Sequence, residues 1–214
     1  GGQQALEWSI EKPNCIRQLI LIATNAVHSP YAKAFNEAQR LALYSDTTYG
    51  KIGGGANGLK SARALAMLSY RSYTDFEIKQ ADAEAKLEGY RAASYVNYQG
   101  SKFTKRFKAT AYHSLTKSMD SHDAGRGRGG VQKALSLVKA RTLVVGVSSD
   151  ILFPLIEQEF LANHIQSADL GIIDSVHGHD AFLIEYDQLE KLIADFLFNH
   201  FKNFKPTILK SINK

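Results

Sequence analysis

Cysteine, proline and long apolar runs are scarce in this chain of 214 residues. Its one cysteine, Cys15, excludes a disulfide framework and a cysteine-rich zinc site. Because Cys15 precedes a predicted buried strand, we expect a structural thiol. The longest apolar run, Leu19–Ala23, is far short of the ~20 residues that a membrane-spanning helix needs. The chain has only four prolines and is 44% hydrophobic, so it is too apolar to be disordered throughout.

The first eight residues contain no basic stretch followed by an apolar one, so no signal peptide is expected there. We therefore expect a cytoplasmic protein. The chain carries 26 Lys and Arg against 21 Asp and Glu, a net charge of +5. This balance favours anionic partners such as nucleic acid, acidic lipid or phosphorylated small molecules, and it is too small to choose among them.

Short aliphatic runs indicate the strands of a parallel sheet. Residues 17–24 and 141–147 are rich in Leu, Ile and Val without interruption, which is typical of strands buried on both faces. A third strand is predicted at 170–174. Helices are predicted at 3–11, 155–164 and 187–202. Strands and helices alternate with short loops, which predicts an α/β layer.

The middle of the chain has no convincing strand. Ser29 and Pro30 begin a helix that we expect to reach Tyr44, because serine caps a helix and proline suits its first turn. A glycine-rich loop follows at 50–58, and further helices are predicted near 59–70, 86–98 and 109–119. We predict an α/β core formed by residues 1–26 and 139–214, with an all-helical domain inserted at residues 27–138.

An acid and a histidine follow two of the predicted strands. Asp150 comes after the strand at 141–147, and His179 comes after the strand at 170–174. The carboxyl ends of parallel strands share one edge of the sheet, so the two side chains can meet there. A carboxylate that fixes the imidazole tautomer leaves the other ring nitrogen as a general base. By position alone, it is equally well possible that Asp150 caps a helix and that His179 is an ordinary loop histidine. A zinc site formed by Asp150, His177 and His179 is a weaker alternative.

Four segments, in order and in register, resemble the homoserine O-acetyltransferases, a family with the α/β-hydrolase fold. They are Gly1–Trp8 (GGQQALEW), His122–Gly130 (HDAGRGRGG), Ser149–Pro154 (SDILFP) and Gly178–Leu183 (GHDAFL). The resemblance implies that Asp150 is the triad acid and His179 the triad base. It also implies that the inserted helices form a lid that roofs the site and carries the contact of a homodimer.

The nucleophile of that family is a serine in a Gly-x-Ser-x-Gly turn, and this pattern occurs nowhere in the chain. Gly1 matches the last glycine of the pattern, which would put the serine two residues upstream. The resemblance therefore implies the C-terminal portion of a longer enzyme with a partial α/β-hydrolase fold. We predict that the chain alone is inactive, because an acid and a base without a nucleophile form no covalent intermediate. A missing N-terminal segment would also leave an exposed sheet edge and low solubility.

Three residues match substrate contacts of the family. Arg63 matches an arginine that holds the carboxylate of the amino acid, a planar anion that suits a guanidinium. Tyr70 lies two turns further along the same helix face, and Asp180 matches a carboxylate that receives the substrate ammonium. Without the resemblance these would be a solvated arginine, a core tyrosine and a loop aspartate.

Other positions are ambiguous or depart from the family. Arg126 and Arg128 lie in a glycine-rich run that, out of context, is similar to an RNA-binding segment; they would otherwise bind backbone carbonyls or a CoA phosphate. Gln3 stands where methionine is often found, and His177 stands where tyrosine is common. Both flank the expected active centre, so they bear on the choice of substrate.

The resemblance implies transfer of an acetyl group from acetyl-CoA to the hydroxyl of L-homoserine through an acyl-serine, with no metal and no bound cofactor. The alternatives are a serine O-acyltransferase, a homoserine O-succinyltransferase and an esterase with the same triad. A basic nucleic-acid-binding module is an alternative from a different class, although neither nucleic acid nor a membrane is the expected partner.

Overall fold

The computed structural model describes residues 1–202. Its helices are α1 (Gly2–Glu11), α2 (Pro30–Tyr44), α3 (Ala56–Tyr70), α4 (Tyr73–Gln80), α5 (Arg91–Thr104), α6 (Ala109–Asp120), α7 (Val131–Leu135), α8 (Leu155–His164) and α9 (Tyr186–Lys202), with a 3₁₀ helix, η1 (Gly178–Leu183). The strands are β1 (Gln18–Ile22), β2 (Arg141–Val147) and β3 (Ala168–Ile173). None of the helices within residues 1–202 is both long and apolar enough to cross a bilayer.

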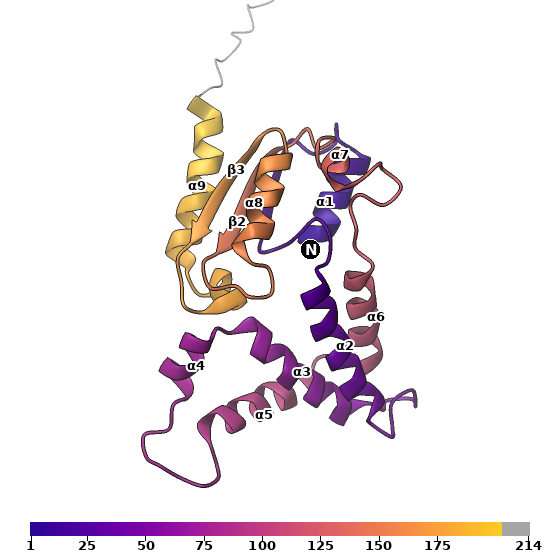
Figure 1. The fold of residues 1–214 in the computed structure, drawn as a ribbon, viewed down its shortest axis with the longest axis vertical. Coiled ribbons are helices and arrows are strands. Elements are labelled where there is room, and N and C mark those ends of the chain that lie inside the picture. The colour runs from indigo at the N-terminus through magenta and orange to yellow at the C-terminus, as the bar shows by residue number, and fades with distance from the viewer. Residues whose placement is uncertain (203–214) are drawn as a thin grey trace, which may run out of the picture.

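The three strands form one parallel sheet in the order β1-β2-β3, with β2 in the centre. Side chains of β2 alternate between the two faces. Val144 packs with residues of α1 and α8, whereas Val145 packs with residues of α9 on the opposite face. Figure 1 shows α8 and α9 on opposite sides of the sheet. Helices cover both faces, which explains why β2 is a continuous aliphatic run and confirms the predicted α/β layer.

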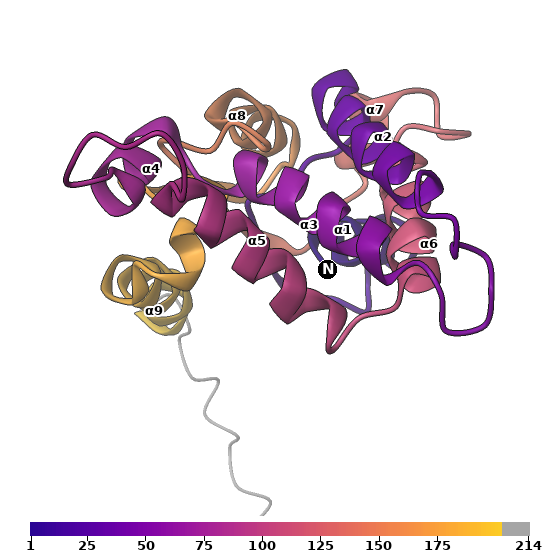
Figure 2. The ribbon, with the colours of Figure 1, turned by 90° about the horizontal axis from the view of Figure 1, so that it is seen from below.

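Helices α2–α6 form the predicted helical insertion, which lies beneath the α/β core in Figure 1. Seen from below, α5 runs alongside α3 (Figure 2). Leu43 of α2, Leu59 of α3 and Phe103 of α5 share a hydrophobic core in this insertion, separate from the core around the sheet.

The chain enters and leaves the insertion at adjacent points. Val27 and Asp123 form an antiparallel bridge, and the amide of His28 donates to the carbonyl of His122 at 3.1 Å. After this crossing, Leu135 and Val138 pack in the core of the sheet. The insertion in the structure therefore ends near Asp123, whereas the sequence prediction placed its end at residue 138.

The predicted strands and most predicted helices are confirmed, with shifted ends. The helix predicted near 86–98 lies at Arg91–Thr104, and α4 was not predicted at all. The N-terminus of α4 is capped by Ser72, whose Oγ accepts from the amide of Asp75 at 3.0 Å. A serine followed three residues later by an acid is a start signal for a helix. This signal is present in the sequence and would have indicated α4.

Candidate active site

Asp150 and His179 meet at the carboxyl end of the sheet, as the strand order predicted. Asp150 follows β2 in a turn that its own carboxylate closes, since Oδ1 accepts from the amides of Leu152 and Phe153 at 2.8 and 2.9 Å. Its Oδ2 lies 2.8 Å from Nδ1 of His179, which is carried by η1 after β3. Asp150 is only 4% exposed, so its carboxylate is fixed by three hydrogen bonds rather than by water.

The orientation of His179 leaves one ring nitrogen available. A carboxylate at Nδ1 requires the proton on that nitrogen, so Nε2 is the basic atom of the neutral ring. Among residues 1–198, no side chain or backbone group hydrogen-bonds to Nε2. Three aromatic rings surround the imidazole, with centroids 5.1–5.6 Å from it: Tyr70, Phe153 and Phe182. These rings restrict rotation of the imidazole and hold Nε2 in one direction.

A cavity of about 200 Å³ lies between the inserted helices and the Asp150 turn. Its walls include Arg63, Tyr70, Phe103 and Leu152. Tyr70 lines the cavity, and its ring also lies beside His179 at a tilt of 39°, so the imidazole is next to the cavity. Burial raises the pKa of Tyr70, so its phenol stays protonated and neutral.

Arg63 is the cation of this cavity. Its guanidinium lies 5.0 Å from the ring centroid of Tyr70 and 4.9 Å from that of Phe103. None of the carboxylates in the described part of the chain forms an ion pair with it. Arg63 is thus held against aromatic rings without a carboxylate partner, and its guanidinium can bind an anion.

Asp180 already forms an ion pair with another residue of the chain. Its Oδ2 lies 3.2 Å from Nε of Arg71, and Nη1 of Arg71 also lies 3.5 Å from Asp75. Asp180 is not among the residues that line the cavity. The resemblance assigns this carboxylate to the substrate ammonium, and in the structure Arg71 holds it.

The arginines of the glycine-rich run bind their own chain. Arg128 bonds to the carboxylates of Glu7 and Glu11, with closest distances of 2.8 and 2.5 Å, and to the carbonyl of Ala124. Arg126 donates to the carbonyl of Ser121. These contacts agree with the backbone-binding alternative.

Two further positions differ from their sequence interpretation. Cys15 is exposed at the surface, so it is not a buried structural thiol. His177 contacts Asp75 of α4. Among residues 1–198 no three His, Cys, Asp or Glu side chains are grouped so that they could hold a metal ion.

The sequence interpretation missed a buried polar network on the floor of the cavity. His28 is 1% exposed, and its Nε2 lies 3.1 Å from Nδ2 of Asn36. Asn36 donates to Asp120, which also binds Arg40 at 2.6 Å. Burial is the main cause that lowers the pKa of His28 to about 4, so this ring is neutral near pH 7. The sequence around His28, which directly precedes the helix cap Ser29, does not indicate that this histidine is buried.

Gln3 connects this network to the start of α1. Its side-chain amide donates to Oδ1 of Asn25 at 3.0 Å and lies 3.4 Å from Nδ1 of His28. Asn25 in turn donates to Glu157, whose pKa is raised by burial. The first turn of α1 therefore lies beside the cavity floor.

Comparison with known proteins gives a consistent result, although no family model matches the chain. Homoserine O-acetyltransferase from Cyclobacterium marinum is 44% identical over 198 residues, covering 92% of this chain and 56% of that protein. The enzyme of the same name from Salinibacter ruber is 39% identical over 211 residues, covering 93% of this chain and 60% of that protein. The chain thus spans little more than half the length of the curated relatives it matches.

Solved structures share the fold. Homoserine O-acetyltransferase from Bacillus anthracis superposes with a TM-score of 0.83 at 20% identity, covering 92% of this chain and 57% of that one. Esterase E22 superposes with a TM-score of 0.82 at 17% identity, covering 92% and 58%. The chain is therefore a homologue of the homoserine O-acetyltransferases, matched over little more than half their length, and its fold is part of the α/β-hydrolase fold.

Proposed function

We propose that this chain is the C-terminal portion of an acyltransferase that moves an acetyl group from acetyl-CoA to the hydroxyl of L-homoserine. The single observation that carries the proposal is the Asp150–His179 pair beside a cavity that contains an unpaired Arg63. The names of the relatives support the choice of substrates. The activity belongs to a longer protein, in which an upstream segment supplies the nucleophilic serine.

The proposed reaction has two halves that use the same base. In the first, Nε2 of His179 takes the proton of the serine hydroxyl, the oxygen attacks the thioester carbonyl, and the C–S bond breaks. The departing thiolate takes the proton from His179, which leaves an acyl-serine. In the second half, Nε2 takes the proton of the homoserine hydroxyl, which attacks the acyl carbonyl, and the serine leaves with that proton. Asp150 fixes the tautomer and stabilises the imidazolium in both halves.

Arg63 and Tyr70 are the proposed contacts of the homoserine carboxylate. The guanidinium fork matches a carboxylate in geometry, and its aromatic neighbours reduce competition from water. Asp180 is the proposed contact of the substrate ammonium, which would then share this carboxylate with Arg71. The lid helices exclude water, whose attack on the acyl group would convert transfer into hydrolysis.

The resemblance also supports a cytoplasmic homodimer that forms through the lid. Large apolar side chains are exposed on lid helices, among them Leu41, Leu68, Tyr73 and Leu115. A dimer contact would bury such side chains. Neither a metal nor a bound cofactor is required by the proposed chemistry.

The test uses the longer protein, produced with the segment upstream of Gly1, and follows CoA release from acetyl-CoA. CoA release that requires homoserine supports the proposal. Faster release with serine as acceptor, or with succinyl-CoA as donor, would assign one of the related transferases instead. The chain expressed alone should release no CoA above the blank rate.

Hydrolysis without an acceptor is the second candidate, favoured by the structural similarity to esterase E22. In that case an acyl ester would be consumed in the absence of homoserine, and addition of homoserine would not change the products. Matched variants, His179→Gln and His164→Gln, separate a role of the candidate base from a general effect of losing a histidine. In the part of the chain that the structure describes, the imidazole of His164 hydrogen-bonds to the carbonyl of Phe160 in its own helix, and its replacement should leave the rate unchanged.

A further inference from the structure

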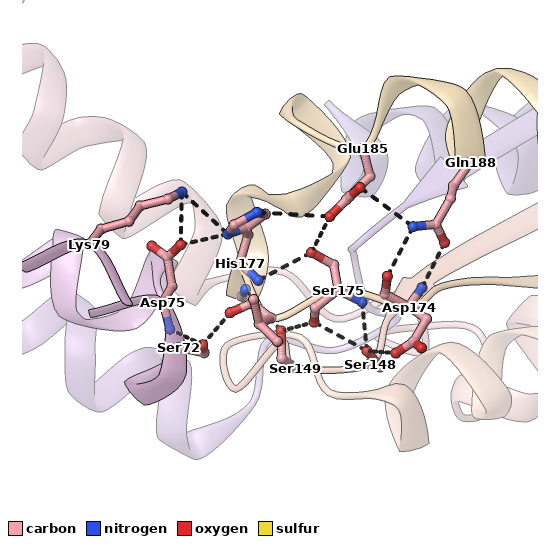
Figure 3. A network of polar contacts seen from close by, with 12 residues as sticks. Ser72, Asp75, Lys79, Ser148, Ser149, Asp174, Ser175, His177, Glu185 and Gln188 are labelled. Atoms are coloured by element: carbon pink, nitrogen blue, oxygen red, sulfur yellow. Dashed lines mark hydrogen bonds and ion pairs between the residues drawn. The ribbon is translucent and has the colours of Figure 1, made fainter. Parts of the chain in front are cut away.

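A second aspartate–histidine pair lies next to the first and connects the lid to the core. His177 is two residues before His179, and its Nδ1 lies 2.5 Å from Oδ1 of Asp75 in α4. Its Nε2 lies 3.9 Å from Oε1 of Glu185, the residue that follows η1 and precedes α9. Figure 3 shows the imidazole between these two carboxylates. None of these groups takes part in the proposed reaction.

The lid contacts the turn that bears His179 at more than this one point. The hydroxyl of Ser72, which caps α4, donates to the carbonyl of Val176. Gly178 lies so close to the lid that a Cβ atom built on it would be 2.8 Å from the amide nitrogen of Ser72 and 2.9 Å from the carbonyl oxygen of Tyr70. The junction of α3 and α4 therefore lies directly on the segment between β3 and η1.

The charges that face His177 come from three elements. Helix α4 contributes Asp75 and Lys79, whose Nζ lies 2.9 Å from Oδ1 of Asp75 and 3.3 Å from the imidazole Nδ1. The segment after η1 contributes Glu185. The α3–α4 junction contributes Arg71, which lies 3.5 Å from the other oxygen of Asp75 and also pairs with Asp180.

The short contact between Asp75 and His177 determines which nitrogen of the imidazole carries a proton. Burial opposes ionisation of Asp75, but hydrogen bonds from Lys79 and His177 outweigh it and lower the pKa of Asp75. Since Asp75 is a carboxylate, Nδ1 of His177 must carry a proton to approach it at 2.5 Å. A neutral ring then has no proton on Nε2, and only the charged ring can donate toward Glu185 as well.

We propose that His177 is a positioning residue that ties helix α4 of the lid to the turn bearing His179, and that the tie is stronger when the imidazole is charged. Its effect on catalysis rests on the proposed function. The ring centroid of Tyr70, at the end of α3, lies 5.6 Å from that of His179, so loosening the lid at His177 would also loosen one of the rings that hold the candidate base. The ring of His177 would thus control how firmly His179 is held against the cavity.

The first test measures the tie itself and does not depend on activity. Hydrogen exchange of residues 72–80 is compared in the longer protein and its variants at about pH 6 and about pH 8, the range in which histidines titrate. His177→Phe removes both polar contacts, and His177→Gln keeps a donor for Asp75 without a charge. We expect about tenfold less protection in His177→Phe at about pH 6 and a smaller difference at about pH 8.

His113→Gln is the matched control, because His113 is a lid histidine that contacts Tyr44 and Tyr49 and lies in α6. It should leave the protection of residues 72–80 unchanged. Equal protection in wild type, His177→Phe and His177→Gln at both pH values would overturn the proposal. If His177→Phe fails to fold, the comparison of His177→Gln with wild type decides the matter alone.

The second test is the ratio of kcat in His177→Gln to kcat in wild type, measured across the same pH range. Any pH dependence that the two proteins share cancels in the ratio. We expect a ratio of about one tenth at low pH that rises toward one at high pH, whereas a merely structural role would give a constant ratio. If no acyl transfer is found in the wild type, the proposed function fails, and hydrogen exchange still decides whether His177 ties the lid to the core.

Discussion

Replacement of Asp150 by asparagine tests the candidate base through its partner. Oδ1 of Asp150 accepts two backbone hydrogen bonds, and an asparagine oxygen in the same place keeps both. The amide nitrogen would then replace Oδ2, which lies 2.8 Å from Nδ1 of His179. An N–H group there favours the tautomer with the proton on Nε2, so the ring can no longer accept a proton from a hydroxyl.

The expected effect is large on rate and small on stability. In a Ser-His-Asp triad the same change lowers kcat by about 10⁴-fold, or about 5 kcal/mol of transition-state stabilisation. Because the two backbone bonds are kept, the free energy of unfolding should change by about 1 kcal/mol or less. Asp150→Ala would instead leave two buried amides unpaired, at about 1–3 kcal/mol each.

The assay pairs acetyl-CoA-dependent CoA release by the longer protein with urea unfolding of the same samples. A fall in kcat with an unchanged unfolding midpoint in Asp150→Asn supports the assignment. Asp150→Asn activity within about tenfold of wild type would refute the reasoning, because a wrong tautomer cannot serve as the base.

Three further changes test other parts of the site. Arg63→Lys should raise the KM for homoserine about tenfold or more with a smaller change in kcat, because lysine lacks the guanidinium fork; equal loss with an acceptor that has no carboxylate would contradict this. Gly178→Ala should lower the free energy of unfolding by about 1–3 kcal/mol in thermal or urea unfolding, because φ is +68° and the added Cβ meets Ser72; an unchanged midpoint would contradict the close approach. The pKa of His28 is lowered by burial to about 4 from 6.5, so the unfolded state binds more protons between these values and stability should fall by about 3 kcal/mol as the pH falls from 6.5 to 4. The variant His28→Phe should lack this part of the pH dependence, and identical slopes would disprove it.

Strands that are buried on both faces could be predicted from the sequence, and so could the two candidate site residues that follow such strands. The strand at 141–147 is aliphatic because helices cover both faces of the sheet, so its pattern and its environment agree. Asp150 and His179 each follow such a strand, and the shared edge of a parallel sheet brings them together. The lack of strands in the middle of the chain agrees with the helices α2–α6.

Contacts between distant segments were not predictable in this way. Asp75 and His177 are 102 positions apart, and nothing in either segment specifies that the α3–α4 junction lies on the turn after β3. The pairing of Asp180 with Arg71 depends on the same placement of the inserted helices. The burial of His28 also arises from tertiary packing, since a histidine before a helix cap is ordinarily solvated.

The most direct measurement is the intact mass of the longer protein after incubation with acetyl-CoA in the absence of an acceptor. The proposal predicts an increase equal to one acetyl group, lost on addition of homoserine, and no increase in His179→Gln. An unmodified wild-type protein, or equal acetylation of the His179→Gln variant, would contradict the assignment of His179 as the base that activates the nucleophile.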